Sequence, residues 1–142
     1  LGVAIGRRTY SAYRKLLGSP RWQRVFNEGA RPQRLLWAST GTKDPDASDV
    51  IYVESLAAPF TVNTMPEPTL RALADHGLVG ALVPIDGGDA EQVLTRFTEA
   101  GVDLDALAEQ LQRDGAASFV KSWHSLLEGI ASRSAELKAA PA

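Results

Sequence analysis

Two short apolar runs, each ending in a polar loop, most constrain the fold of this chain. The first is Leu-Leu-Trp-Ala at residues 35–38, which leads directly into Ser-Thr-Gly-Thr-Lys. The second is Thr-Val-Asn at residues 61–63, which leads into Thr-Met-Pro-Glu. The first run has no polar alternation, which suits a strand buried on both faces of a parallel sheet. Strand ends that open onto such loops are where α/β proteins place their functional groups.

Helical patterns surround these two runs. Residues 10–17 carry apolar side chains at helical spacing. Ser19 is the expected N-cap of a second helix, and Gly29 stands where its C′ residue would be. Thr64 and Glu67 match a capping box at the start of a third helix. The order helix, strand, helix, strand, helix predicts βα units rather than a helix bundle.

The remaining segments are less regular. Residues 49–53 are rich in β-branched and aromatic side chains and predict a strand, with a helical turn that displays Tyr52 as the alternative. Asp103 is the expected N-cap of a helix that closes near Gly115. A last helix follows, and we expect its apolar stripe to pack onto a core. The stripe consists of Phe119, Val120, Trp123, Leu126, Leu127 and Ile130.

Composition excludes several classes of protein. The 142 residues, 44% hydrophobic and 23% charged, suit one globular domain. The net charge of −2 argues against nucleic acid as the main partner. No apolar run approaches the roughly 18 residues of a membrane span. The chain has no cysteine, which excludes disulfides and thiolate metal sites. We expect no metal, no cofactor and a cytoplasmic location.

The start of the sequence and the shortage of strands raise one further expectation. The chain begins at Leu1, and its only methionine is Met65. Two or three strands are too few to bury both faces of a parallel sheet. We therefore expect this chain to be the C-terminal part of a longer α/β protein, with processing of the natural product as the alternative.

Several segments, in order, resemble one enzyme family. Residues 37–45 are Trp-Ala-Ser-Thr-Gly-Thr-Lys-Asp-Pro, and residues 61–70 are Thr-Val-Asn-Thr-Met-Pro-Glu-Pro-Thr-Leu. Together with Asp-Val-Ile-Tyr-Val-Glu at 49–54 and Ala-Asp-His-Gly at 74–77, they closely resemble the C-terminal region of the long, bacterial type of transaldolase. The opening helix and the helical tail resemble the same family, so the resemblance covers nearly the whole chain.

This resemblance implies the α/β fold of a (β/α)8 TIM barrel. Residues 35–39 would be barrel strand seven, and residues 62–63 would belong to strand eight. The chain would then be a partial barrel domain over residues 1–142. We divide it into the last βα units (1–88), the C-terminal helices (89–135) and a frayed tail (136–142).

The resemblance also implies a transferase of the non-oxidative pentose phosphate pathway. Such enzymes move a dihydroxyacetone unit between sugar phosphates of the sedoheptulose 7-phosphate and glyceraldehyde 3-phosphate type, through a Schiff base on a lysine. None of the four lysines here matches the family's lysine motif. By resemblance, no catalytic residue lies in this chain, and we expect it to be inactive alone. The expected partners are the sugar phosphate and, through an exposed barrel seam, a second copy of the chain.

Candidate binding residues stand in the loops after the two runs. Hydroxyls, loop amides and an ammonium group form a phosphate cradle, in which a lysine acts as a point charge. The resemblance makes Ser39 and Thr40 the best phosphate ligands, with Lys43 beside them. Asn63 is expected to face the pocket. The alternatives are that Ser39 and Thr40 only cap the loop, that Lys43 is solvated, and that Asn63 ties down its own loop.

Other polar and aromatic residues receive structural interpretations. We expect Trp37 in the core, Glu54 solvated, His76 at a helix end, and His124 at the edge of the apolar stripe without a metal-ligand partner. Two alternatives to an enzyme fragment stay open. One is a non-catalytic domain that binds a sugar phosphate or a protein, and the other is a helical interaction module over residues 89–135.

Overall fold

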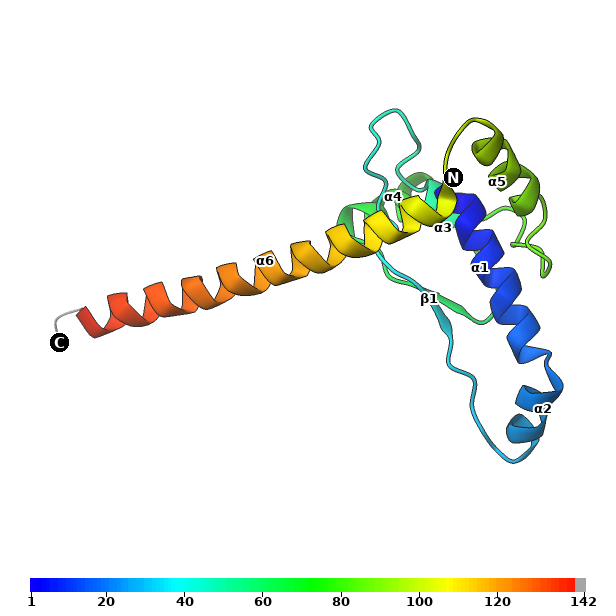
Figure 1. Ribbon diagram of the computed structural model, residues 1–142, viewed down its shortest axis with the longest axis horizontal. Helices are drawn as coiled ribbons and strands as arrows, with labels where there is room; N and C mark the ends of the chain where they lie inside the picture. Colours follow the sequence, from blue (N-terminus) through cyan, green and yellow to red (C-terminus); the bar gives the residue numbers. More distant parts are fainter. Residues whose placement is uncertain (140–142) are drawn as a thin grey trace. The chain divides into compact units, whose positions relative to one another are not determined.

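The computed structural model describes residues 1–139 as a mostly helical α/β chain with one small sheet (Figure 1). Its first compact unit is Leu1–Phe97, and a second unit begins at Thr98. The elements are α1 (Gly2–Leu17), α2 (Pro20–Asn27), β1 (Leu35–Trp37), α3 (Ile51–Ser55), β2 (Thr61–Asn63), α4 (Glu67–His76), α5 (Ala90–Glu99) and α6 (Leu104–Ala139).

The sheet of the first unit consists of β1 and β2. The two strands are parallel, with Leu35 opposite Thr61, Leu36 opposite Val62 and Trp37 opposite Asn63. Both expected strands are therefore confirmed, and they are neighbours. Because parallel strands end at the same edge of a sheet, the loops that follow β1 and β2 begin side by side.

The core of the first unit forms around the end of β1. Tyr10 of α1 is fully buried, and Trp37, Leu56 and Val83 pack with it. The Trp37 indole Nε1 donates a hydrogen bond of 3.0 Å to the Leu56 carbonyl oxygen, which satisfies its one polar atom. Gly6 lets α1 approach, because a Cβ atom there would lie 2.7 Å from a Leu56 methyl. The expected core position of Trp37 is confirmed.

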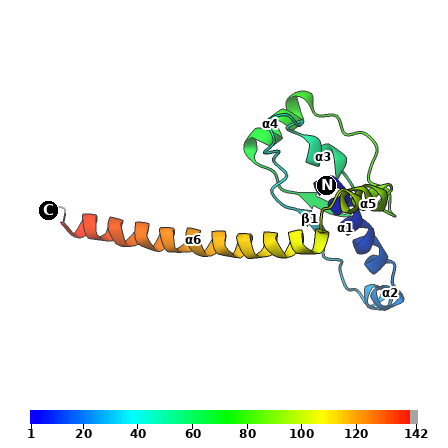
Figure 2. The same cartoon turned by 45° about the horizontal axis from the view of Figure 1, so that its top comes forward.

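The ends of α2 follow the expected capping chemistry. The Ser19 hydroxyl accepts a hydrogen bond of 3.2 Å from the Trp22 amide, and Pro20 occupies the first turn. Gly29 follows the helix with φ of 98°, a conformation that glycine adopts without steric cost. These caps turn the chain out of α1, through α2, and back toward β1 (Figure 2).

Residues 49–53 do not form the expected strand. The structure has the helical alternative, because Ile51–Ser55 is α3. The Ser48 carbonyl accepts from the Ile51 amide, and this turn starts the helix. Val53 is buried and Tyr52 packs against the core. The β-branched and aromatic side chains therefore pack inward from a short helix rather than from a strand.

The prediction of a capping box at Thr64 and Glu67 is also wrong. The residue before α4 is Pro66, and no side chain caps this helix. The Thr64 amide and hydroxyl both donate to the Trp37 carbonyl oxygen, at 2.9 and 3.2 Å. The Glu67 carboxylate instead accepts from Arg71 one turn later. The Trp37 carbonyl, far away in sequence, thus takes the Thr64 amide that the capping box would have paired with the Glu67 side chain.

The second unit is dominated by α6. Asp103 caps it as expected, with Oδ1 accepting from the Asp105 and Ala106 amides. The helix does not stop near Gly115, because a glycine in a helix interior costs only about 1 kcal/mol. It continues to Ala139, so residues 136–139 of the expected frayed tail are helical, and residues 140–142 lie outside the described residues. The proposed division at residues 88 and 135 stays a prediction.

The apolar stripe of α6 is exposed. Phe119 is 80% exposed, and Trp123, Leu126 and Ile130 each expose more than half of their surface. The expected packing of this stripe onto a core is therefore not seen. Over residues 1–139, no helix combines the length and the apolar character that crossing a membrane requires.

The Trp37 hydrogen bond generates a stability prediction. Replacing Trp37 with Phe leaves a void and an unpaired Leu56 carbonyl, so the free energy of unfolding should fall by about 2–4 kcal/mol. The exposed Trp123→Phe on α6 is the matched control and should change it by less than about 0.5 kcal/mol. Urea denaturation followed by circular dichroism measures both. Equal effects of the two variants would contradict the assigned core.

Candidate functional site

Polar side chains from both strand ends meet at one edge of the sheet. Thr40 is 5% exposed, and its hydroxyl donates a hydrogen bond of 2.6 Å to Asn63 Oδ1. The same hydroxyl lies 3.3 Å from the Thr64 carbonyl oxygen. We call Ser39, Thr40 and Asn63 the strand-end site. The structure brings together Thr40 and Asn63, two of the residues singled out in the sequence.

The Thr40 hydrogen bond decides which groups remain available to a ligand. A hydroxyl has one proton, and that of Thr40 is directed to Asn63. Asn63 therefore uses its carbonyl oxygen within the protein, and its amide NH2 group remains to donate elsewhere. In this conformation, Thr40 orients Asn63 rather than offering its own hydroxyl proton.

Ser39 presents its side chain from a strained backbone. Its φ is 54°, in the left-handed region that few residues other than glycine occupy, and the residue is exposed. Such conformations cost on the order of 1 kcal/mol and cluster at functional sites. Gly41, two residues later, is needed because a Cβ atom there would lie 3.0 Å from the Pro66 ring. The loop after β1 thus packs closely against the residue before α4.

Lys43 stands apart from the other site candidates. Its side chain is exposed, and within residues 1–139 it forms no ion pair. It lies on the same loop as Ser39, four residues further along. Its contribution to a phosphate site stays a prediction. In the described part of the chain, no group of three or more His, Cys, Asp or Glu side chains has the arrangement of a metal site.

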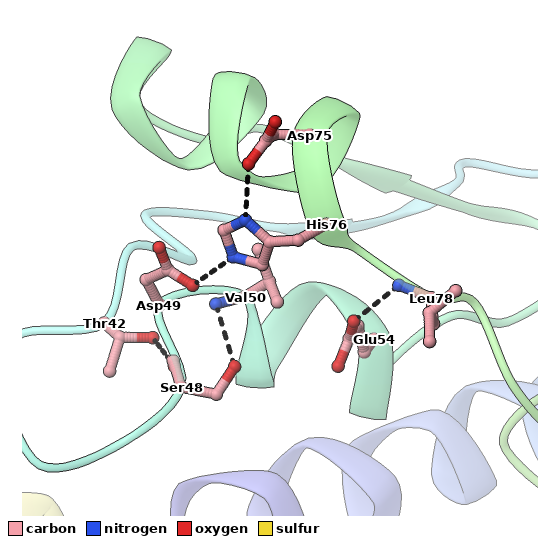
Figure 3. Close-up of polar contacts among 8 residues, drawn as sticks. All are labelled: Thr42, Ser48, Asp49, Val50, Glu54, Asp75, His76 and Leu78. Carbon is pink, nitrogen blue, oxygen red and sulfur yellow. Dashed lines mark hydrogen bonds and ion pairs between the residues drawn. The ribbon is translucent and has the colours of Figure 1, made fainter.

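A second polar cluster, which the sequence did not indicate, surrounds His76 (Figure 3). His76 Nε2 lies 3.0 Å from Asp49 Oδ1, and Nδ1 lies 3.2 Å from Asp75 Oδ2. These hydrogen bonds, first that with Asp49 and then that with Asp75, raise the pKa of His76 above its ordinary value. Both ring nitrogens are engaged, so His76 fastens the segment before α3 to the end of α4. Its expected place in the last helical turn is confirmed.

Glu54, like His76, joins two segments of the first unit through a hydrogen bond. Its Oε1 accepts a hydrogen bond of 2.7 Å from the Leu78 amide, which joins α3 to the segment after α4 (Figure 3). The side chain is half-buried rather than solvated, which corrects the expectation from sequence. Among residues 1–139, no second carboxylate is hydrogen-bonded to it, so the structure does not make it part of an acid–base pair.

Comparison with known proteins assigns the chain to a family. The profile of the family described as Transaldolase/Fructose-6-phosphate aldolase matches residues 1–130. The chain belongs to this family. It is 49% identical to a transaldolase of Parafrankia sp., over 90% of this chain and 35% of the relative. It is 48% identical to the transaldolase of Frankia alni, over 91% of this chain and 35% of the relative.

A third relative supports the same family assignment. The transaldolase of Mycolicibacterium paratuberculosis is 48% identical over 89% of this chain. This chain spans 35% of the length of each of these three relatives. All four lysines of this family member are exposed, on α1, in the loop after β1, and on α6: Lys15, Lys43, Lys121 and Lys138.

The His76 cluster predicts a pH dependence of stability. The folded pKa of His76 lies above its unfolded value near 6.5. Its stabilising contribution is therefore fully present below pH 6.5 and is lost as the pH rises through the folded pKa. The stability difference between wild type and His76→Gln should shrink across that window, as followed by urea unfolding at several pH values.

The matched control is His124→Gln, because His124 is exposed on α6. NMR titration adds a direct test: Asp49→Asn should lower the His76 pKa more than Asp75→Asn does, since the Asp49 hydrogen bond is the larger cause. A His76 pKa that neither substitution lowers would show that the cluster does not form in solution.

Proposed function

We propose that the strand-end site binds the phosphate group of a sugar phosphate and forms one wall of a transaldolase-type active site. The observation that carries this proposal is the Thr40–Asn63 hydrogen bond where two adjacent parallel strands end, with the exposed Ser39 next to Thr40 in the chain. Family membership supports it. In (β/α)8 barrels, active sites are built from the loops at this end of the strands.

The sheet fits two consecutive strands of such a barrel. β1 and β2 are parallel and paired, and the 23 residues between them include α3. We propose that they are barrel strands seven and eight, with residues 1–142 forming a C-terminal portion of the domain. Leu36, in the middle of β1, is 50% exposed, which leaves apolar surface for a further part of a barrel or for a second copy of the chain.

In the proposed phosphate site, each residue has a separate role. The Ser39 hydroxyl donates to a phosphate oxygen, and the Asn63 amide NH2 donates from the neighbouring strand. Thr40 holds Asn63 in that orientation through the 2.6 Å hydrogen bond. Lys43 adds positive charge from the flexible end of its side chain, without the bidentate geometry that an arginine provides.

The reaction proposed for the site is the transfer of a dihydroxyacetone unit from a ketose phosphate to an aldose phosphate. Its Schiff base requires an amine in an apolar, desolvated pocket. All four lysines of this chain are exposed instead. We propose that none of them is the nucleophile and that this polypeptide, alone, binds the phosphate without performing the transfer. The same observation favours the second candidate function, a non-catalytic sugar-phosphate-binding domain.

A serine substitution tests the phosphate site. Ser39→Ala removes the exposed donor, so the dissociation constant for fructose 6-phosphate should rise by about threefold to tenfold. Ser122→Ala, an exposed serine on α6, is the control and should leave the constant unchanged. Isothermal titration calorimetry measures both. Unchanged binding by Ser39→Ala would remove Ser39 from the site.

Borohydride trapping tests the role of the lysines separately. A Schiff base between fructose 6-phosphate and a lysine is reduced by borohydride to a stable secondary amine. The 142-residue chain, incubated with fructose 6-phosphate and borohydride, should show no such adduct by mass spectrometry. A transaldolase from one of the relatives serves as the positive control. An adduct on any of the four lysines would contradict the proposal while leaving the phosphate site intact.

A further inference from the structure

A cavity of about 310 Å³ lies in the first unit, between α1, α2 and the residues that precede the strands. Phe60 directly precedes β2, and Pro32 stands shortly before β1, so the cavity belongs to the starts of the strands, whereas the strand-end site follows their ends. We propose that this cavity binds a small aromatic carboxylate. Its main walls are Arg14, Leu17, Trp22, Phe26, Pro32 and Phe60.

Arg14 supplies the recognition of the carboxylate. Its guanidinium carbon lies 5.2 Å from the centre of the Phe60 ring and 5.8 Å from that of Tyr10. Nη1 donates to the Tyr10 hydroxyl at 2.9 Å, which fixes the group in place. Within residues 1–139, no carboxylate forms an ion pair with it. A half-buried guanidinium without a counter-ion favours a bound anion, and its fork matches the two oxygens of a carboxylate.

The aromatic walls determine the shape of the ligand. The Trp22 and Phe26 rings have centroids 6.4 Å apart and are tilted by 40°. Phe60 exposes 54% of its surface, although its φ of 63° is unfavourable for any residue except glycine. Strained backbone positions of this kind cluster at binding sites. Flat rings gain both burial and ring–ring contact in such surroundings.

The cavity discriminates against a sugar phosphate. Apart from Arg14, the side chains in its wall that can form hydrogen bonds are the Trp22 indole N–H and Gln23, whose Nε2 already donates to the Leu17 carbonyl oxygen at 2.6 Å. These few groups cannot replace the hydrogen bonds to water of several sugar hydroxyls, and each buried hydroxyl left unpaired costs about 1–3 kcal/mol. The volume is at the small end of ligand pockets, which suits one ring system.

The charge of the surrounding segment favours anions. Residues 1–34 contain eight Arg or Lys and a single Glu, although the whole chain has a net charge of −2. Arg7 and Arg8 are ion-paired with Asp89 and Glu91. The others leave this segment strongly positive, and such a field concentrates anions near it.

The test is ¹⁹F NMR of 4-fluorobenzoate with the 142-residue chain. The fluorine signal should broaden in a saturable way, and unlabelled benzoate should reverse the broadening. Benzamide, which has the same shape without the charge, should compete at least about tenfold less well, since a hydrogen-bonded charge pair contributes about 1.5–3 kcal/mol. Fructose 6-phosphate should not compete. Equal competition by benzamide, displacement by fructose 6-phosphate or the absence of broadening would overturn the proposal.

Two substitutions on α1 locate the site. Arg14→Gln should weaken binding of 4-fluorobenzoate by about tenfold or more. Lys15→Gln removes an exposed charge from the next position and should leave binding within about twofold, because exposed charges contribute little. Wild-type affinity in Arg14→Gln would overturn the proposal. Circular dichroism checks that Arg14→Gln folds. If it does not fold, the comparison of benzoate with benzamide on the wild-type chain still tests the proposal.

Discussion

Hydrogen bonds between the residues at the end of β1 and those at the end of β2 hold together the edge of the sheet that carries the strand-end site. Thr40 donates to Asn63, and Thr64 donates twice to the Trp37 carbonyl oxygen. Each strand has only three residues, so its backbone ladder contributes few hydrogen bonds. The bonds at the strand ends extend this short pairing into the loops. This connection orients Asn63 and lies next to the buried Trp37 and the strained backbone of Ser39.

The sequence predicted those parts of the structure that local patterns determine. The apolar runs located both strands, and Ser19 and Gly29 marked the ends of α2. The lack of alternation predicted a parallel strand buried on both faces; the pairing is parallel, but Leu36 is 50% exposed. The Thr40–Asn63 bond was not predicted, because its partners are 23 residues apart and nothing local specifies their contact. The His76–Asp49 pair, with a separation of 27 residues, was missed for the same reason.

The wrong local predictions have a common physical cause. Thr64 and Glu67 match a capping box, but a tertiary acceptor, the Trp37 carbonyl, takes the Thr64 amide that the Glu67 side chain would have accepted. Residues 49–53 have β-type composition, yet a turn at Ser48 and burial of Val53 favour a short helix. At Gly115, a modest helix-propensity cost did not break α6. Tertiary contacts or helix continuity outweighed a local preference in each case.

The two ends of the sheet differ in chemistry. Hydroxyl and amide groups occupy the end where the proposed phosphate site lies, and an arginine among aromatic rings occupies the other. Membership of the transaldolase family is the basis of the reaction proposed for the first end. The proposal that none of the exposed lysines is the nucleophile limits what this polypeptide is expected to do alone. The ligand proposed for the second end is inferred from its own residues, independently of that reaction.

The central claim is that the paired strand ends form a phosphate-binding site. The most direct measurement is a two-dimensional ¹H–¹⁵N NMR titration of the 142-residue chain with fructose 6-phosphate. The account predicts saturable shifts of the backbone amides of residues 39–43 and of the Asn63 side-chain NH2, with the amides of α6 unaffected. Shifts confined to other parts of the chain, or an unchanged spectrum at saturating ligand, would contradict it.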